Sequence, residues 1–107
     1  MKKNQISIIG LGKIGSALAK NFCSNNFFVY GFDIKKHAYE FGKNFYKSSS
    51  IEALIKNTTS PRLIFVVVPS GKSNSSVINW LLPIIHKTDT VIDMSNSNYK
   101  FAEKFEK

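Results

Sequence analysis

Residues 5–15 have the sequence QISIIGLGKIG, which holds the clearest structural signal in the chain. The run Gln5–Gly10 is rich in β-branched residues and predicts a short strand that ends at a glycine. Apolar residues at helical spacing follow within Ile14–Phe22 and predict a helix. A strand that runs through a glycine-rich turn into a helix is the start of a β-α-β unit, so we expect a parallel sheet.

The alternation of strands and helices continues along the chain. Leu63–Val68 (LIFVVV) is apolar at every position, as a central parallel strand covered on both faces requires. Pro83 falls inside the last long helical pattern and predicts a kink or an early end. The expected strands are Gln5–Gly10, Phe27–Phe32, Phe45–Lys47, Leu63–Val68 and Thr90–Met94, and the expected helices are Ile14–Phe22, Lys35–Gly42, Ser50–Lys56, Ser75–His86 and Tyr99–Phe105. We therefore predict a doubly wound parallel α/β sheet, with residues 1–107 forming one domain.

The charge balance permits one class of partner but gives it little support. The chain has 107 residues, with 15 Lys and Arg against 7 Asp and Glu, for a formal charge of +8. A basic protein can bind nucleic acid or an anionic surface. The lysines are scattered, and Arg62 is the single arginine, which leaves little material for bidentate recognition of bases. We keep a nucleic-acid-binding domain as an alternative and expect no nucleic-acid partner.

Hydropathy and cysteine content indicate the cellular compartment of the protein. No apolar run approaches the roughly 20 residues of a membrane-spanning helix, so we expect no membrane partner. The N-terminal residues lack the apolar core and cleavage site of a signal peptide. One cysteine, Cys23, excludes an internal disulfide and is expected to be buried, and two distant histidines do not suggest a metal site. These features predict a cytoplasmic protein without a bound metal.

Two signals in the first half of the chain point to a ligand. Gly10-Leu11-Gly12-Lys13-Ile14-Gly15 fits G-x-G-x-x-G, in which the glycines allow a tight turn, close approach of a pyrophosphate, and close packing of helix on strand. Asp33 ends the second expected strand, 18 residues after Gly15, where an acid accepts hydrogen bonds from the adenosine ribose. Together they predict a Rossmann-type dinucleotide-binding domain. The other interpretation is that the glycines only punctuate a loop and Asp33 caps the next helix.

Asp33 also bears on the choice of cofactor. A carboxylate repels the 2′-phosphate of NADP, so Asp33 favours NAD, and NADP is the less favoured alternative. Lys35 and Lys36 follow closely, and either could pair with a 2′-phosphate. We therefore expect NAD as the cofactor.

Several linked motifs resemble the N-terminal domain of 6-phosphogluconate dehydrogenase, and the likeness is greatest to its NAD-preferring branch. They are GLGKIGSALAKNF (10–22), GFDIKK (31–36), SPRLIFVVVPSGKSNSSVINWLLPII (60–85) and VIDMSNSNY (91–99). The resemblance covers roughly Gln5 to Lys104. It implies an oxidoreductase in which NAD, or NADP, takes a hydride from C3 of a sugar acid that then loses carbon dioxide.

The resemblance also implies which residues meet the cofactor. Gly10, Leu11, Gly12, Lys13, Ile14 and Gly15 would form the phosphate loop, Asp33 would hold the ribose, Val68, Pro69 and Ser70 would line the cofactor cleft, and Asn96 would lie between nicotinamide and substrate. In the family the lysine base lies downstream of the matched part. The resemblance therefore implies no catalytic residue in this chain, which would be a truncated member that is inactive alone. A companion chain or a C-terminal catalytic domain would supply the base.

One motif departs from the family pattern. The family has D-G-G-N-S where this chain has Asp93-Met94-Ser95-Asn96-Ser97, which looks like the related 3-hydroxyisobutyrate-type dehydrogenases. Two alternatives therefore remain beside the first interpretation. One is a fragment of such a dehydrogenase, and the other is a stand-alone NAD-binding module with a regulatory or sensing role.

Overall fold

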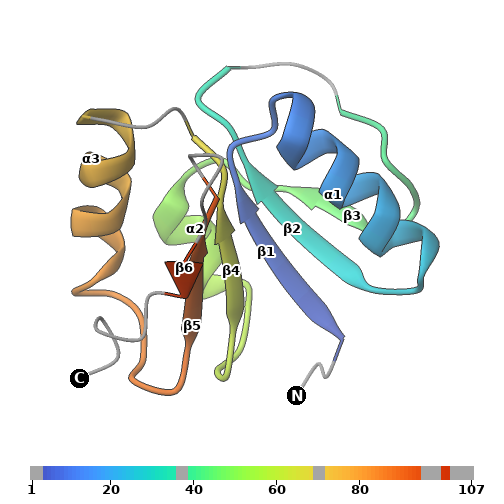
Figure 1. Cartoon of the computed structure of the whole chain (residues 1–107). Coiled ribbons are helices and arrows are strands. Elements are labelled where there is room, and N and C mark those ends of the chain that lie inside the picture. Colours follow the sequence, from blue (N-terminus) through green and yellow to red (C-terminus); the bar gives the residue numbers. More distant parts are fainter. Residues whose placement is uncertain (1–3, 36–38, 69–71, 95–99, 102–107) are drawn as a thin grey trace.

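The computed structural model describes residues 4–35, 39–68, 72–94 and 100–101. Its centre is a six-stranded sheet in the order β3-β2-β1-β4-β5-β6 (Figure 1). The parallel strands are β1 (Gln5–Ile9), β2 (Phe28–Phe32), β3 (Phe45–Lys47), β4 (Leu63–Val66) and β5 (Thr90–Asp93). The last strand, β6 (Lys100–Phe101), pairs antiparallel with β5. The predicted parallel sheet is confirmed, and its five strands lie close to their expected bounds.

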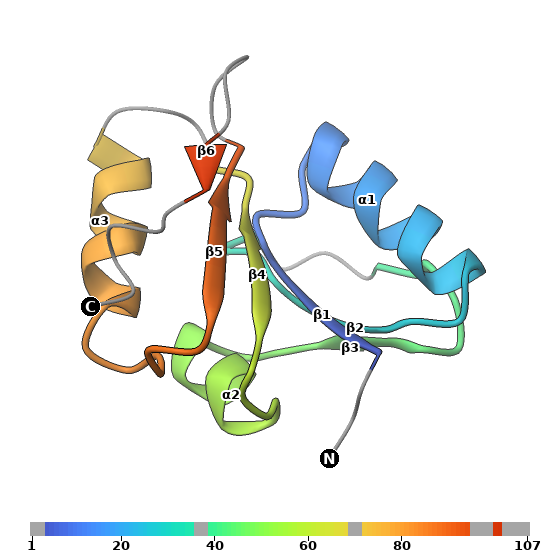
Figure 2. The same cartoon turned by 60° about the horizontal axis from the view of Figure 1, so that its bottom comes forward.

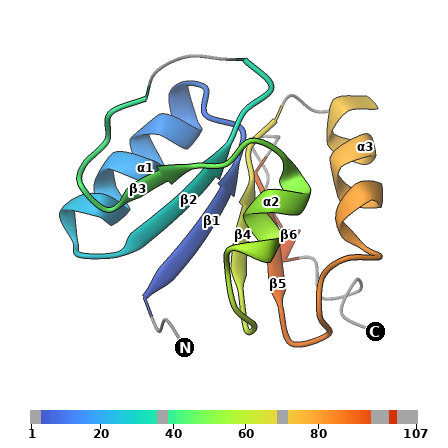
Figure 3. The same cartoon turned by 180° about the vertical axis from the view of Figure 1, so that it is seen from behind.

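Helices cover both faces of the sheet, as a doubly wound fold requires. Helix α1 (Lys13–Ser24) lies on one face, and α2 (Ile51–Lys56) and α3 (Lys72–Leu81) lie on the other (Figures 2 and 3). The hydroxyl of Ser50 accepts a hydrogen bond from the N–H of Ala53 (3.0 Å) and caps α2. Helix α3 ends two residues before Pro83, which confirms the early end predicted from that proline.

Successive strand residues point to opposite faces and feed two apolar cores. The core under α1 holds Ile6, Ile8, Leu11, Ala19, Cys23, Val29 and Phe65. The core under α2 and α3 holds Ile9, Tyr30, Ile51, Leu54, Ile55, Ile64, Val66, Ile78, Leu81 and Val91. Cys23 is buried as expected, and this burial raises the pKa of its thiol. Apolar packing on both faces therefore holds the sheet, and with it the ends of its strands, in place.

The expected helix Lys35–Gly42 is wrong at residues 39–42, which are not helical. The Tyr39 and Phe41 rings stack with centroids 5.6 Å apart, and Phe41 packs edge-on against Phe45 at 4.8 Å. In a helix residues two apart lie on different sides, whereas in extended chain they share one. This aromatic packing therefore disfavours a helix at Tyr39 and Phe41, and a turn at residues 43–44 leads into β3. Residues 36–38 of the same prediction lie outside the described residues.

The expected helix Tyr99–Phe105 is also wrong where it can be compared. Lys100 pairs with Asp93 and Phe101 with Ile92, which makes residues 100–101 a strand. A helical pattern this short is marginal on its own, and the open edge of β5 offers backbone partners instead. Residue 99 and residues 102–105 lie outside the described part of the chain.

The carboxyl ends of β1, β2 and β4 meet at one edge of the sheet. Strands β2 and β4 flank β1, so the chain leaves β1 toward one side and later returns on the other. Open α/β sheets bind ligands in the crevice at such a reversal of strand order. Among the described residues, no helix is long and apolar enough to cross a membrane.

Candidate functional site

The site is built around the turn that joins β1 to α1. Gly10 has φ +103°, which side-chain-bearing residues rarely adopt, and its N–H donates to the carbonyl of Phe32 (2.8 Å) at the end of β2. A Cβ on Gly10 would lie 2.7 Å from the carbonyl carbon of Val67, just after β4. The turn is thus held between the ends of two strands, and both its conformation and its surroundings require glycine.

Gly12 and Gly15 differ in what surrounds them. A Cβ on Gly15 would overlap the backbone carbonyl of Gly10, so this glycine lets the first turn of α1 rest directly on the loop. A Cβ on Gly12 would meet no heavy atom of the described residues within 4 Å. Gly12 therefore presents bare backbone to open space, the arrangement that lets a pyrophosphate approach closely.

The amino end of α1 carries backbone donors beside this space. Gly12 is the N-cap residue, and its carbonyl accepts a hydrogen bond from Ser16 N–H (2.8 Å). It has no side chain to accept from the first turn, and the first turn contains no acidic residue. Helix geometry leaves the N–H groups of Lys13, Ile14 and Gly15 without partners inside the helix. These donors and the helix dipole favour an anion such as phosphate.

Asp33, directly after β2, connects two loops. Its Oδ2 accepts a hydrogen bond from Leu11 N–H at 2.6 Å, and its Oδ1 accepts one from Lys35 N–H at 2.8 Å. The carboxylate is therefore anchored against the glycine turn. Each oxygen has further acceptor capacity, so the group can still accept from a ribose diol. Residues 34–35 and 39–42 contain no helix that Asp33 could cap.

A pocket of about 470 Å³ opens beside Asp33, within the range of small-molecule sites. It is lined by Phe32, Asp33, Ile34, Lys47, Ser48 and Ser49. Ile34 is 85% exposed, which leaves an apolar surface next to the carboxylate. The pocket thus combines an acceptor, a cation, hydroxyl-bearing residues and an apolar side chain.

Of these lining residues, Asp33 alone was among the predicted site residues. Phe32 and Ile34 are its chain neighbours, whereas Lys47, Ser48 and Ser49 come from a distant part of the sequence. Lys47 pairs with Gly31 of β2, and Ser48 N–H donates to the carbonyl of Gly31 (2.7 Å). Parallel strands end at the same edge, so whatever follows β3 must lie beside Asp33. The strand order β3-β2-β1 was the missing information, and the sequence signal was the short strand that ends at Lys47.

The structure brings together Gly10, Leu11, Gly12, Lys13, Ile14, Gly15, Asp33 and Val68 at the carboxyl edge of the sheet. The side chain of Leu11 is only 3% exposed and belongs to the core, so this residue offers the site its N–H, which Asp33 accepts. Val68 is half-buried and lies close to Gly10, in the chain that leaves β4. Pro69, Ser70 and Asn96 lie outside the described residues.

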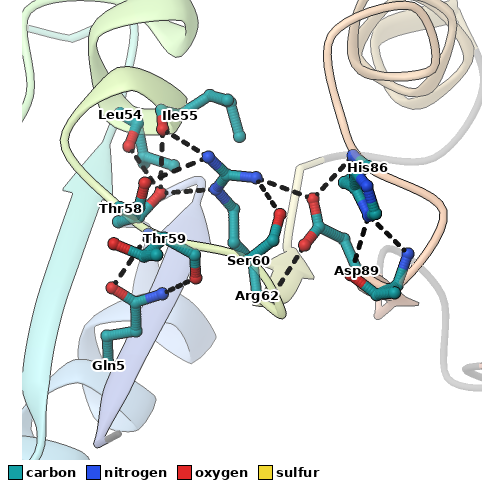
Figure 4. Close-up of polar contacts among 10 residues, drawn as sticks. Gln5, Leu54, Ile55, Thr58, Thr59, Ser60, Arg62, His86 and Asp89 are labelled. Atoms are coloured by element: carbon teal, nitrogen blue, oxygen red, sulfur yellow. Dashed lines mark hydrogen bonds and ion pairs between the residues drawn. The ribbon is translucent and has the colours of Figure 1, made fainter. Parts of the chain in front are cut away.

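A second polar cluster lies at the opposite edge of the sheet (Figure 4). Arg62, before β4, and Asp89, before β5, form an ion pair of 2.9 Å, and Asp89 is fully buried. Burial by itself raises the pKa of Asp89. Hydrogen bonds from the backbone N–H groups of His86 and Arg62, joined by those from the Ser60 and Arg62 side chains, outweigh that effect and hold the pKa below its usual value. The guanidinium also donates to Thr58 and Ser60, so the single arginine is used inside the fold.

Other chemistry is not supported by the part of the chain that the structure describes. No group of three or more His, Cys, Asp or Glu side chains gathers there in a way that could hold a metal ion. His86 follows α3, and its ring Nδ1 lies 2.8 Å from the Thr88 hydroxyl. The glycine turn, Asp33 and the adjoining pocket therefore remain the candidate site.

These features define a class of protein, the dinucleotide-binding α/β domains. Solved structures show the same fold. A D-isomer specific 2-hydroxyacid dehydrogenase from Lactobacillus delbrueckii ssp. bulgaricus, in its NAD-complexed form, aligns with 83% of this chain and 26% of its own, at TM-score 0.65 and 22% identity. D-lactate dehydrogenase with NAD⁺ from Lactobacillus jensenii aligns equally well, over 84% and 26% of the two chains at TM-score 0.65 and 22% identity.

The chain belongs to the family of NAD-binding domains of 6-phosphogluconate dehydrogenase, whose sequence model matches residues 5–107. It is 34% identical over 110 residues to the NADP⁺-dependent, decarboxylating 6-phosphogluconate dehydrogenase of Bacillus subtilis (strain 168), covering 97% of this chain and 24% of that protein. It is 32% identical over 102 residues to the decarboxylating enzyme of Staphylococcus aureus (strain Mu50), covering 90% and 22%. The chain thus spans about a quarter of the length of these relatives.

Proposed function

We propose that residues 1–107 act as one domain that holds NAD while a hydride is taken from a 3-hydroxy sugar acid of the 6-phosphogluconate type. The observation that carries this proposal is the position of the Asp33 carboxylate. Hydrogen bonds from Leu11 and Lys35 anchor it between the glycine turn and the pocket. An acceptor fixed at that point suits a ribose whose pyrophosphate lies over Gly12.

The residues divide the work of holding the cofactor. The backbone at Gly10–Gly15 and the first turn of α1 bind the pyrophosphate, and Asp33 accepts from the adenosine ribose. Ile34 packs against the adenine with its exposed apolar surface. The resemblance to the family assigns Val68, Pro69 and Ser70 to the nicotinamide side of the cleft and Asn96 to the contact between nicotinamide and substrate, and the proposal adopts these roles. The bound cofactor supplies the hydride acceptor, and these residues bind and orient it.

NAD is the preferred cofactor in this proposal. The relative from Bacillus subtilis is named as NADP⁺-dependent, and that name describes the relative. In this chain a 2′-phosphate would lie close to the Asp33 carboxylate, and like charges repel at close range.

The catalytic base comes from outside these residues, from a companion chain or a C-terminal catalytic domain. Two facts support this part of the proposal. The relatives are about four times as long as the part that matches, and the described site contains binding groups rather than an acid–base pair. A cytoplasmic location belongs to the same proposal and fits the single free cysteine; fractionation of the source cells tests it.

Calorimetric titration of the purified chain with NADH and NADPH tests the binding claim. We expect saturable binding of NADH that is stronger than that of NADPH. Asp33→Ala should weaken NADH binding about tenfold, the effect of losing roughly 1.4 kcal/mol of hydrogen bonding to a charged group. Glu40→Ala, which removes an exposed carboxylate that does not line the pocket, is the control. Equal binding of both cofactors, unchanged by Asp33→Ala, would contradict the proposal.

Turnover tests the second half of the proposal. The chain alone, mixed with NAD and 6-phosphogluconate, should produce no NADH above the background of a Gly12→Ala variant. Robust turnover by the isolated chain would show that the base lies within residues 1–107.

A further inference from the structure

Lys47 shares the pocket with Asp33 without neutralising it. Both residues line the pocket. Among the described residues the one ion pair is that of Arg62 with Asp89, so the charged groups of Lys47 and Asp33 are not within ion-pair distance of each other. The two oxygens of Asp33 accept from Leu11 and Lys35, whereas the Nζ of Lys47 lies over the ring of Tyr39, 5.2 Å from its centroid. A carboxylate-bearing residue and an ammonium-bearing residue thus line one pocket without forming a close ion pair.

Tyr39 is a rigid support for this lysine. Its ring stacks on Phe41, which in turn packs edge-on against Phe45 of β3. Burial raises the pKa of the Tyr39 phenol, and the nearby charge of Asp33 raises it further, so the phenol stays neutral at pH 7. A neutral aromatic face attracts an ammonium group without cancelling its charge. The Nζ of Lys47 therefore lies against a neutral ring rather than against a carboxylate.

We propose that Lys47 determines cofactor specificity, because its ammonium group receives the 2′-phosphate of NADP in the pocket beside Asp33. The inference rests on the proposed function, since it takes the adenosine ribose to lie on Asp33. The hydroxyl-bearing residues Ser48 and Ser49 line the same pocket and add neutral donors for phosphate oxygens.

Because the charges of Asp33 and Lys47 act on a 2′-phosphate in opposite directions, we expect NAD to bind more tightly than NADP without NADP being excluded. Asp33 repels a phosphate on the ribose, and Lys47, which lines the same pocket, attracts it. Lys35 is the rival cation, but its described contact with Asp33 is made by its backbone N–H, and it does not line the pocket. Lys47 is the one lysine of the described residues that does.

Binding measurements on nucleotide fragments isolate this interaction from hydride transfer. Adenosine 2′,5′-bisphosphate carries the 2′-phosphate and 5′-AMP lacks it, so calorimetric titration with both, and with NADPH and NADH, reports on the pocket. Lys47→Gln should lower the affinity for the two 2′-phosphorylated ligands about tenfold, as expected for a lost charge-assisted contact. It should change the affinity for AMP and NADH less than twofold. Lys47→Arg, which keeps the charge, should retain most of the affinity for both 2′-phosphorylated ligands.

Two further variants serve as controls. Lys56→Gln removes the same charge from the exposed end of α2 and should leave all four affinities unchanged. Lys35→Gln combined with Lys36→Gln tests the rival cations. The inference is overturned if Lys47→Gln lowers the affinity for the 2′-phosphorylated ligands less than threefold, or if the affinity for AMP and NADH falls by as much. It is also overturned if the Lys35/Lys36 double variant, rather than Lys47→Gln, loses affinity for the 2′-phosphorylated ligands. Failure of the wild-type chain to bind even NADH and AMP would overturn the proposed function itself, and the inference with it.

Discussion

Replacing Gly12 and Gly15 separately by alanine should separate ligand binding from folding. Both glycines belong to the same six-residue motif and lie three residues apart. Their surroundings are opposite, because a Cβ on Gly15 would overlap the Gly10 carbonyl and a Cβ on Gly12 would enter open space. We predict that Gly15→Ala mainly destabilises the fold and that Gly12→Ala mainly weakens binding of the cofactor.

The cost at Gly15 follows from what the new methyl group would meet. The obstacle is backbone, with the Gly10 carbonyl carbon 2.9 Å away, so no side chain can rotate aside. Overpacking of this kind costs about 1–3 kcal/mol, and a collision with backbone belongs at or above the upper end. The better helix propensity of alanine offsets about 1 kcal/mol. We expect a net loss of about 2 kcal/mol, or roughly 9 °C in Tm for a chain of this length.

The cost at Gly12 falls on binding instead. Its φ of −74° and ψ of −153° are accessible to alanine, and the methyl group touches nothing in the described fold. The free energy of unfolding should therefore change by no more than about 0.5 kcal/mol. The methyl group would stand between the backbone and the pyrophosphate, so NADH affinity should fall tenfold or more, equivalent to at least about 1.4 kcal/mol.

Urea denaturation followed by circular dichroism gives the stabilities, and NADH titration gives the affinities. Measurements at one temperature on the wild-type chain and both variants complete the comparison. The reasoning is refuted if Gly12→Ala binds NADH as tightly as the wild-type chain, or if Gly15→Ala is as stable as Gly12→Ala.

Three other predictions concern stability and use the same denaturation assay. Asp89→Asn should lower the free energy of unfolding at pH 7 by about 3 kcal/mol, because it leaves the largely buried guanidinium of Arg62 without its charged partner. Since the folded pKa of Asp89 lies below its unfolded value of about 3.9, its stabilisation is complete above that value and is lost as the pH falls toward the folded pKa; an acid transition identical in wild type and Asp89→Asn would refute this. Ser7→Ala should leave stability unchanged or raise it by up to about 1 kcal/mol, because the Ser7 hydroxyl is buried without a partner among the described atoms. Ser50→Ala should lower stability by about 1 kcal/mol through loss of the α2 cap. A clear loss of stability in Ser7→Ala would contradict the first expectation, and an unchanged stability in Ser50→Ala would contradict the second.

The parallel sheet could be predicted because local and global signals agree. Leu63–Val66 lies fully inside the sheet and is apolar throughout, and Ser50 and Pro83 mark helix ends by their own chemistry. The two helices that were predicted wrongly are short. Their segments take another conformation because of tertiary contacts, which the periodicity of the sequence does not reveal. Ring packing of Tyr39 on Phe41 decided the first, and pairing of Lys100 with Asp93 decided the second.

The site could be predicted in part for a similar reason. Asp33 was found from its spacing to the glycines, and the structure places its carboxylate on the N–H of Leu11. Lys47 was missed because its role depends on β3 lying beside β2, which is a matter of strand order. The arginine network of Arg62 and Asp89 was missed because residues 27 apart in sequence meet only in the folded sheet.

The central claim is that a dinucleotide binds across the glycine turn and Asp33. Amide chemical-shift mapping of the ¹⁵N-labelled chain during titration with NADH tests this most directly. We predict saturable shifts at residues 10–16 and 33–35 with little change around Arg62 and Asp89, at the opposite edge of the sheet. Shifts confined to that opposite edge, or no shifts at all in a folded sample, would contradict the account.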